Sequence, residues 1–123
     1  MVVKFQDLQQ FSIDDVEAAL RRNSPDELPM VPIILALSSS DHALAVSVCV
    51  RLAPHPDPNV RGNAIMSLGH IARRFRALDE TLIKPLIELA LQDKNDQVRS
   101  LAKAAADEIH QFLHWTISGH MYG

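Results

Sequence analysis

Two histidines on one predicted helix have the spacing of a metal-binding pair. His110 and His114 are four residues apart, so both imidazoles lie on the same side of a helix, and imidazole nitrogens are common zinc ligands. A third ligand could come from His70, Asp107 or His120. A zinc site needs three or four ligands, and the chain has no His-Glu-x-x-His motif. We therefore treat the pair as a weak metal candidate and favour a solvated or partner-facing role.

The residues that could support nucleophilic catalysis lack the motifs that would activate them. Cys49 is the single cysteine, so the chain can form neither an intramolecular disulfide nor a four-cysteine zinc site. It lies on an apolar helical stripe, where we expect a buried, inert thiol. The four glycines form no phosphate-binding loop, and no nucleophile-elbow motif is present. We expect no catalytic residue, no cofactor and no enzyme activity.

Three arginines close another predicted helix, at Arg73, Arg74 and Arg76. Cations stabilise a helix C-terminus, so a solvated helix end explains the cluster. The alternative is a contact with an anionic partner, either nucleic acid or an acidic protein. A net charge of −3 and an isoelectric point of about 6.0 argue against a protein that grips a nucleic acid backbone. The same charge permits a basic protein partner.

The composition is that of one globular domain. The chain has 123 residues, of which 47% are hydrophobic and 5% aromatic, enough to bury a core. It has no apolar run of the ~18 residues that a membrane span needs, and its first residues lack a signal-peptide pattern. We expect a soluble, cytoplasmic protein.

Hydrophobic periodicity and capping residues predict about six helices. They are expected near residues 13–22, 29–37, 41–53, 58–76, 79–91 and 96–115. Asp57 followed by Pro58 fits an N-cap and a first helical position. The run 28–37 is apolar on most sides, which predicts a central helix.

Two helical pairs repeat one another at an interval of 38 residues, and such an interval is typical of stacked repeats. The repeated positions are Val60-Arg61-x-x-Ala64 and Val98-Arg99-x-x-Ala102. Both arginines lie in the first turn of a helix, where the helix dipole disfavours a cation. We therefore expect each arginine to contact a carboxylate. The candidates are Asp57, Asp93 and Asp96.

This pattern resembles a HEAT repeat of the short, regular kind called HEAT-like or PBS-lyase-type. The resemblance covers residues 41–76 and 79–115 as two units, with 12–37 as a degenerate N-terminal pair and 116–123 as a flexible tail. It implies a single all-α domain, a right-handed superhelix of three antiparallel pairs. It also implies an Asp–Arg ladder between stacked repeats. The residues given this structural role are Asp57, Arg61, Asp96 and Arg99.

In this family, the second helix of each pair lines the concave surface. The resemblance thus implies a binding surface made of positions off the buried stripes. These are His70, Arg73, Arg74, Lys103, Asp107, His110, Gln111 and His114. Trp115, at the end of the last helix, is either an exposed binding anchor or a lid over the last hydrophobic layer, and Tyr122 is a further candidate anchor.

These observations predict a non-catalytic protein-binding module. Its small size, mild acidity and lack of catalytic motifs suggest an immunity- or antitoxin-type protein that occludes one partner, such as a basic toxin or enzyme. One alternative is nucleic acid binding through the arginine cluster. The other, implied by the PBS-lyase branch of the family, is an accessory lyase-like role on a tetrapyrrole.

Overall fold

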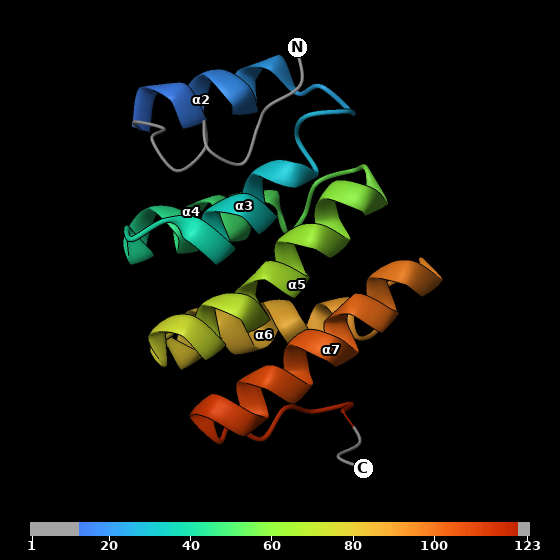
Figure 1. Ribbon diagram of the computed structural model, residues 1–123. Coiled ribbons are helices and arrows are strands. Elements are labelled where there is room, and N and C mark those ends of the chain that lie inside the picture. Colours follow the sequence, from blue (N-terminus) through green and yellow to red (C-terminus); the bar gives the residue numbers. More distant parts are fainter. Residues whose placement is uncertain (1–12, 121–123) are drawn as a thin grey trace.

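The structure is a computed structural model that describes residues 13–120, and within that range it contains helices and no strand. The helices are α2 (Ile13–Arg22), α3 (Met30–Ser38), α4 (His42–Leu52), α5 (Pro58–Phe75), α6 (Glu80–Ala90) and α7 (Asp96–Leu113). In Figure 1, α3, α5 and α7 are stacked in a front layer, α4 and α6 lie behind them, and α2 lies across the end near the N-terminus. The predicted all-α solenoid is confirmed. No helix among residues 13–120 is long and apolar enough to cross a membrane.

The side chain predicted to cap α5 does so in the structure, and α7 begins with a similar cap. Asp57 accepts a hydrogen bond from the Asn59 backbone N–H at 2.9 Å, with Pro58 at the first position of α5. Asn95 accepts one from Val98 at 3.1 Å and begins α7. Such caps satisfy backbone donors that the helix itself leaves unpaired. The starts of both repeated second helices are therefore set by local sequence.

The apolar stripes predicted on the repeated helices form the centre of the core. On α5 and α7, respectively, the buried members are Val60, Ala64, Leu68 and Ile71, and Val98, Ala102, Ala105 and Ile109. α5 packs against α3, α4, α6 and α7, and so joins both layers. Burial of each Val, Leu or Ile side chain contributes about 1.5–3 kcal/mol, so these stripes hold the stack together.

Two glycines allow α5 and α7 to approach closely. They are seven residues apart, which is about two helical turns. A Cβ added at Gly69 would lie 2.9 Å from the Cα of Ala105, and one added at Gly62 would lie 2.9 Å from Leu101 Cδ1. Gly69 therefore has a packing role that sequence analysis missed, whereas the flexible end of Leu101 could move away from a Cβ at position 62.

The outer side of α3 differs from the sequence-based expectation. The helix buries Val31, Ile34 and Leu35, but Met30 is 45% exposed and Leu37 is 39% exposed. Among residues 13–120, α3 packs mainly against α4 and α5, and Met30 and Leu37 keep part of their surface accessible. The prediction of a central helix is therefore correct for one side of α3 and wrong for the other.

The segment after α7 packs against the rest of the chain more closely than predicted. His114 adopts a left-handed conformation with φ of 61°, so α7 ends at Leu113, two residues before the predicted end. Ile117 is 2% exposed, and His120 Nε2 lies 2.8 Å from Asp107 Oδ1. Ile117 and His120 thus contact the rest of the chain, and the flexibility of this tail stays a prediction. Residues 121–123, and Ser12, predicted as a helix cap, lie outside the described residues.

Candidate functional site

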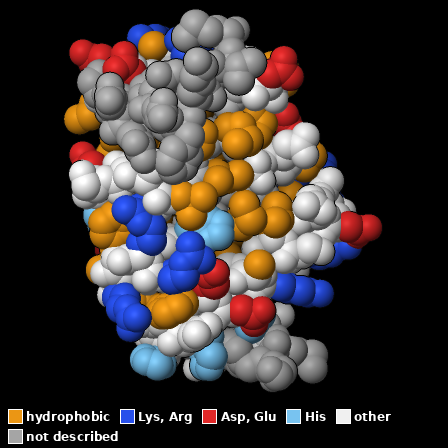
Figure 2. Space-filling model, in the orientation of Figure 1, with side chains coloured by type: hydrophobic (Ala, Val, Ile, Leu, Met, Phe, Trp, Pro, Cys, Tyr) orange, Lys and Arg blue, Asp and Glu red, His pale blue; other side chains and the backbone are white. Residues whose placement is uncertain are grey.

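The exposed side chains of α3, α5 and α7 form one surface, which we call the second-helix face. Figure 2 shows hydrophobic side chains gathered over α3 and α5, and Lys and Arg side chains near the C-terminal end of α5. α3 has no charged residue, and α5 has no acidic residue and carries Arg73 and Arg74 in its last turn. The apolar side chains on α3 that are fully or partly exposed are Met30, Ile33 and Leu37. This half of the face is therefore apolar and cationic.

Arg74 is exposed, yet it ties α5 to the end of α3. Its Nη1 donates to the Ala36 carbonyl at 2.6 Å and its Nη2 to the Ser39 carbonyl at 3.0 Å. The last carbonyls of a helix have no partner within the helix, so Arg74 satisfies part of the α3 C-terminus. At the other end of α3, Asn63 Nδ2 donates to the Pro29 carbonyl at 3.0 Å. α3 is thus fixed against α5 at both ends.

His70 and Arg73 contact a carboxylate on the neighbouring second helix. Arg73 Nη1 donates to Glu108 Oε1 at 3.0 Å, and His70 Nδ1 lies 3.8 Å from Glu108 Oε2. Burial lowers the pKa of His70; Glu108 opposes that shift and Arg73 adds to it. A lowered pKa favours the neutral imidazole at neutral pH. The guanidinium of Arg76 lies 5.1 Å from the ring centre of Phe112, close enough for a cation–π interaction.

The arginine cluster is therefore part of the contacts between helices. Arg73 reaches α7, Arg74 reaches the end of α3, and Arg76 stacks on a ring of α7. Charged side chains held in this way keep a defined position on the surface. The sequence predicted a solvated helix end, whereas in the structure these arginines also connect neighbouring helices.

Most of the binding residues predicted on α7 and at its end have solvent-exposed side chains. Those classed as exposed are Lys103, Asp107, Gln111 and His114, while His110 is half-buried. His110 Nδ1 lies 2.9 Å from the Trp115 carbonyl oxygen. No group of three or more His, Cys, Asp or Glu side chains within residues 13–120 is placed to hold a metal ion.

Trp115 is buried and is not an exposed anchor. Only 8% of its surface is accessible, because the chain turns at His114 and carries Trp115 into the core. The prediction of an exposed anchor at this position is wrong, and the alternative of a lid over the last hydrophobic layer fits. Tyr122 lies outside the described residues.

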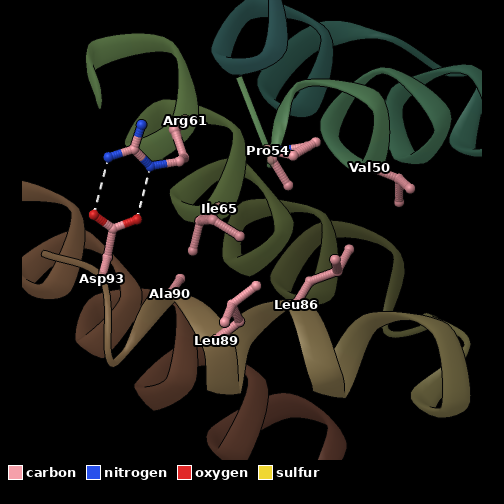
Figure 3. Close-up of a pocket in the computed structure, with 9 residues that line it drawn as sticks. Val50, Pro54, Arg61, Ile65, Leu86, Leu89, Ala90 and Asp93 are labelled. Atoms are coloured by element: carbon pink, nitrogen blue, oxygen red, sulfur yellow. Dashed lines mark hydrogen bonds and ion pairs between the residues drawn. The ribbon is translucent and has the colours of Figure 1, made fainter. Parts of the chain in front are cut away.

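Arg61 makes the most buried ion pair between the two repeats. Its Nε and Nη2 donate to the Asp93 carboxylate at 2.7 and 2.9 Å, and the two side chains are 14% and 13% exposed (Figure 3). Arg99 Nη1 donates to the Asp93 carbonyl at 2.6 Å, and its Nη2 contacts the Asp96 carboxylate. Among the three candidate carboxylates, Asp93 therefore binds Arg61, Asp96 contacts Arg99, and Asp57 caps α5.

The Arg61–Asp93 pair makes stability sensitive to acid. The hydrogen bond from Arg61 holds the pKa of Asp93 below its ordinary value of 3.8, although burial opposes the shift. Near pH 3.8, the Asp93 carboxyl is therefore protonated less often in the folded protein than in the unfolded chain. The contribution of the pair is complete above the ordinary pKa and is lost as the pH falls through the lower, folded pKa.

We expect Asp93→Asn to cost more stability at pH 7 than at pH 3. Urea unfolding of both proteins at the two pH values measures the difference. A difference in unfolding free energy that is equal at both pH values would contradict the assigned role of this carboxylate.

Behind the second-helix face, a groove separates α4 from α6. It has a volume of about 170 Å³, and its apolar lining residues are Val50, Ala53, Pro54, Ile65, Leu86, Leu89 and Ala90. Figure 3 shows Val50 of α4 and Pro54, in the turn after α4, facing the α6 residues, with the Arg61–Asp93 pair at one end. Sequence analysis missed this groove, because it depends on how far apart two helices are held. The sequence did hold one indication of it: α6 has more leucines than a single buried stripe requires.

Comparison with known proteins gives one match. A family model described as HEAT repeats matches residues 13–107. No curated protein and no solved structure matches the chain.

Proposed function

Because this chain belongs to the HEAT repeat family, whose repeats generally mediate protein–protein interactions, we propose that it is a non-catalytic module that binds a partner protein through its second-helix face. The observation that carries the proposal is the exposure of Met30 and Leu37 on α3, whose C-terminal end is held by Arg74 of α5. Apolar patches bordered by polar groups are typical of interaction sites. The other predicted members of this face, on α7, would form its polar border.

We propose further that the module acts by occlusion, as immunity- and antitoxin-type proteins do. α3 and α5 are fixed to each other at both ends by Arg74 and Asn63. A surface that is already rigid loses little conformational entropy on binding. Such a face is suited to covering a site on its partner without rearrangement.

The charge of the second-helix face indicates which charge a partner would carry. The net charge of −3 led to the expectation of a basic toxin or enzyme as partner. On this face, however, Arg73, Arg74 and Arg76 lie at the C-terminal end of α5, with Glu108 paired to Arg73, and complementary charges speed and orient association. For this face we therefore propose a partner segment that combines apolar and acidic side chains.

The double substitution Met30→Ser, Leu37→Ser tests the proposed surface. We expect it to weaken partner binding about 30-fold, which is about 2 kcal/mol, since it removes apolar surface that the interface would bury, and to change stability by no more than about 1 kcal/mol. Tagged protein incubated with native lysate, followed by mass spectrometry, identifies the partner, and a binding titration with that partner gives the fold-change.

The matched control is Leu82→Ser on α6, because Leu82 is 47% exposed but lies on the other layer. We expect this variant to bind like the wild type. Equal partner recovery by the wild type, the double variant and the control would contradict the proposal.

Nucleic acid binding is the second candidate, and the arginine cluster is the observation that favours it. It requires retention on heparin, a steep salt dependence, and the loss of both when Arg73, Arg74 and Arg76 are replaced by Ala. Protein binding through Met30 and Leu37 requires neither. The tetrapyrrole alternative requires a change in visible absorbance when bilin is added, and a flat titration would remove it.

A further inference from the structure

The outer side of α6 carries an apolar stripe that the proposed function does not use. Leu82, Pro85 and Leu89 are all classed as exposed, and their spacing of three and four residues places them along one side of the helix. Leu89 is 72% exposed, the highest value among the large hydrophobic side chains of the described residues. A continuous exposed stripe of this kind is typical of an interaction site.

Leu89 also borders the groove between α4 and α6. The groove has a volume of about 170 Å³ and an apolar lining, and an apolar cavity of about 150 Å³ is enough to admit a benzene-sized group. The groove can therefore take an aliphatic side chain from outside. Figure 3 shows Leu86 and Leu89 opposite Val50 and Pro54 across this space. A projecting leucine and a cavity that fits a leucine thus lie next to each other on one surface.

Three cations around this surface are paired with carboxylates within the chain, and Lys94, next to Asp93, is exposed. At one end of the groove, Arg61 binds Asp93. The other pairs near α4 and α6 are Lys84 with Glu80, Arg51 with Glu17, and Glu88 with the Ser118 backbone N–H. Across a two-fold axis each surface meets an identical copy of itself, and like charges that face one another are unfavourable. Pairing these three cations with carboxylates lowers that cost, while the Glu88 carboxylate, which accepts a backbone N–H, keeps its charge.

We propose that two copies of this chain associate through their α4–α6 sides about a two-fold axis, with Leu89 of each copy inserted into the groove of the other. A two-fold interface requires such reciprocal contacts. α4 and α6 lie on the opposite side of the stack from α3, α5 and α7 (Figure 1). Both second-helix faces therefore stay accessible in the dimer. The inference does not depend on the proposed function.

Sedimentation equilibrium of the full chain over a range of concentrations tests the proposal. We expect the wild type to approach twice its monomer mass of 13.7 kDa, and Leu89→Asp to raise the dimer dissociation constant at least about 30-fold. Leu37→Asp, on the other face, should dimerise like the wild type. Leu89 and Leu37 are both exposed, so the variants should stay folded, as circular dichroism can verify.

A second measurement tests the reciprocal contact itself. Leu89→Cys protein mixed with Pro54→Cys protein should form an intermolecular disulfide faster than either variant alone. A wild type that stays monomeric at every concentration overturns the proposal, as does a dimer that Leu89→Asp leaves intact. Occupation of the groove by a different protein, with no self-association, also overturns it.

Discussion

Replacing Gly69 with alanine is expected to lower the free energy of unfolding by about 2 kcal/mol. The new Cβ would lie 2.9 Å from the Cα of Ala105 and 3.4 Å from its Cβ. A backbone atom cannot rotate away, so α5 and α7 must separate along their contact, and overpacking of this kind costs about 1–3 kcal/mol. The better helix propensity of alanine offsets about 1 kcal/mol of this cost. A net loss of about 2 kcal/mol therefore corresponds to an overpacking cost of about 3 kcal/mol.

Gly62→Ala is the matched control on the same helix. Its Cβ would meet Leu101 Cδ1 at 2.9 Å, which is the far end of a flexible side chain. We expect no loss of stability, or a gain of up to about 1 kcal/mol. Thermal unfolding measures both variants, and a loss of about 2 kcal/mol corresponds to a melting temperature about 8 °C lower. Equal effects of the two substitutions would contradict the proposed close approach.

Replacing Asp93 with alanine is expected to cost about 2–3 kcal/mol. The substitution leaves Arg61 without its carboxylate in a site where its side chain is only 14% exposed. Breaking a buried pair costs about 3–5 kcal/mol and breaking an exposed pair about 0–1 kcal/mol, and this pair lies between these cases. Asp93 also accepts the Asn95 backbone N–H at 2.9 Å, so the start of α7 loses a contact as well.

The Arg61–Asp93 effect has two controls. Asp96→Ala removes a carboxylate that is 93% exposed, and we expect a loss of about 0.5 kcal/mol or less. The double variant Arg61→Leu, Asp93→Ala should lose less stability than the sum of the two single variants, because it leaves no unpaired charge. Chemical denaturation of the four variants provides these values. Strict additivity would show that the two side chains do not interact.

The sequence was sufficient to predict those features that depend on residues close to one another in the chain or on the repeat itself. Asp57 and Pro58 fix the start of α5 through backbone chemistry that needs no tertiary context. The interval of 38 residues identified the stacked units, because equivalent positions must meet equivalent neighbours in each layer. Val60 and Val98 are both buried as their motif predicted.

Sequence was insufficient where a position depends on packing partners. Leu37 belongs to a run that is apolar on most sides, but its exposure depends on what α4 and α5 leave uncovered. Trp115 was misassigned in part because His114 turns the chain in a left-handed conformation that is uncommon for a residue with a side chain. The choice of Asp93 as the partner of Arg61 required the relative placement of the two repeats. The groove beside Leu89 required the separation of two helices.

The two proposed sites lie on different layers and differ in character. The proposed second-helix site combines Met30 and Leu37 with the arginine cluster at the end of α5, which would suit a partner of another sequence. The proposed α4–α6 site combines Leu89 with three ion pairs, which would suit a second copy. Substitutions on one layer should therefore leave binding at the other unchanged.

Site-specific photo-crosslinking tests the central claim, partner binding through the second-helix face, most directly. A photoreactive phenylalanine analogue is placed at Leu37 in one protein and at Leu82 in another, and each is irradiated with the partner recovered from native lysate. We expect the Leu37 probe to form a covalent adduct with the partner, and the Leu82 probe to form none with it. A partner adduct formed from Leu82 and not from Leu37 would contradict the account.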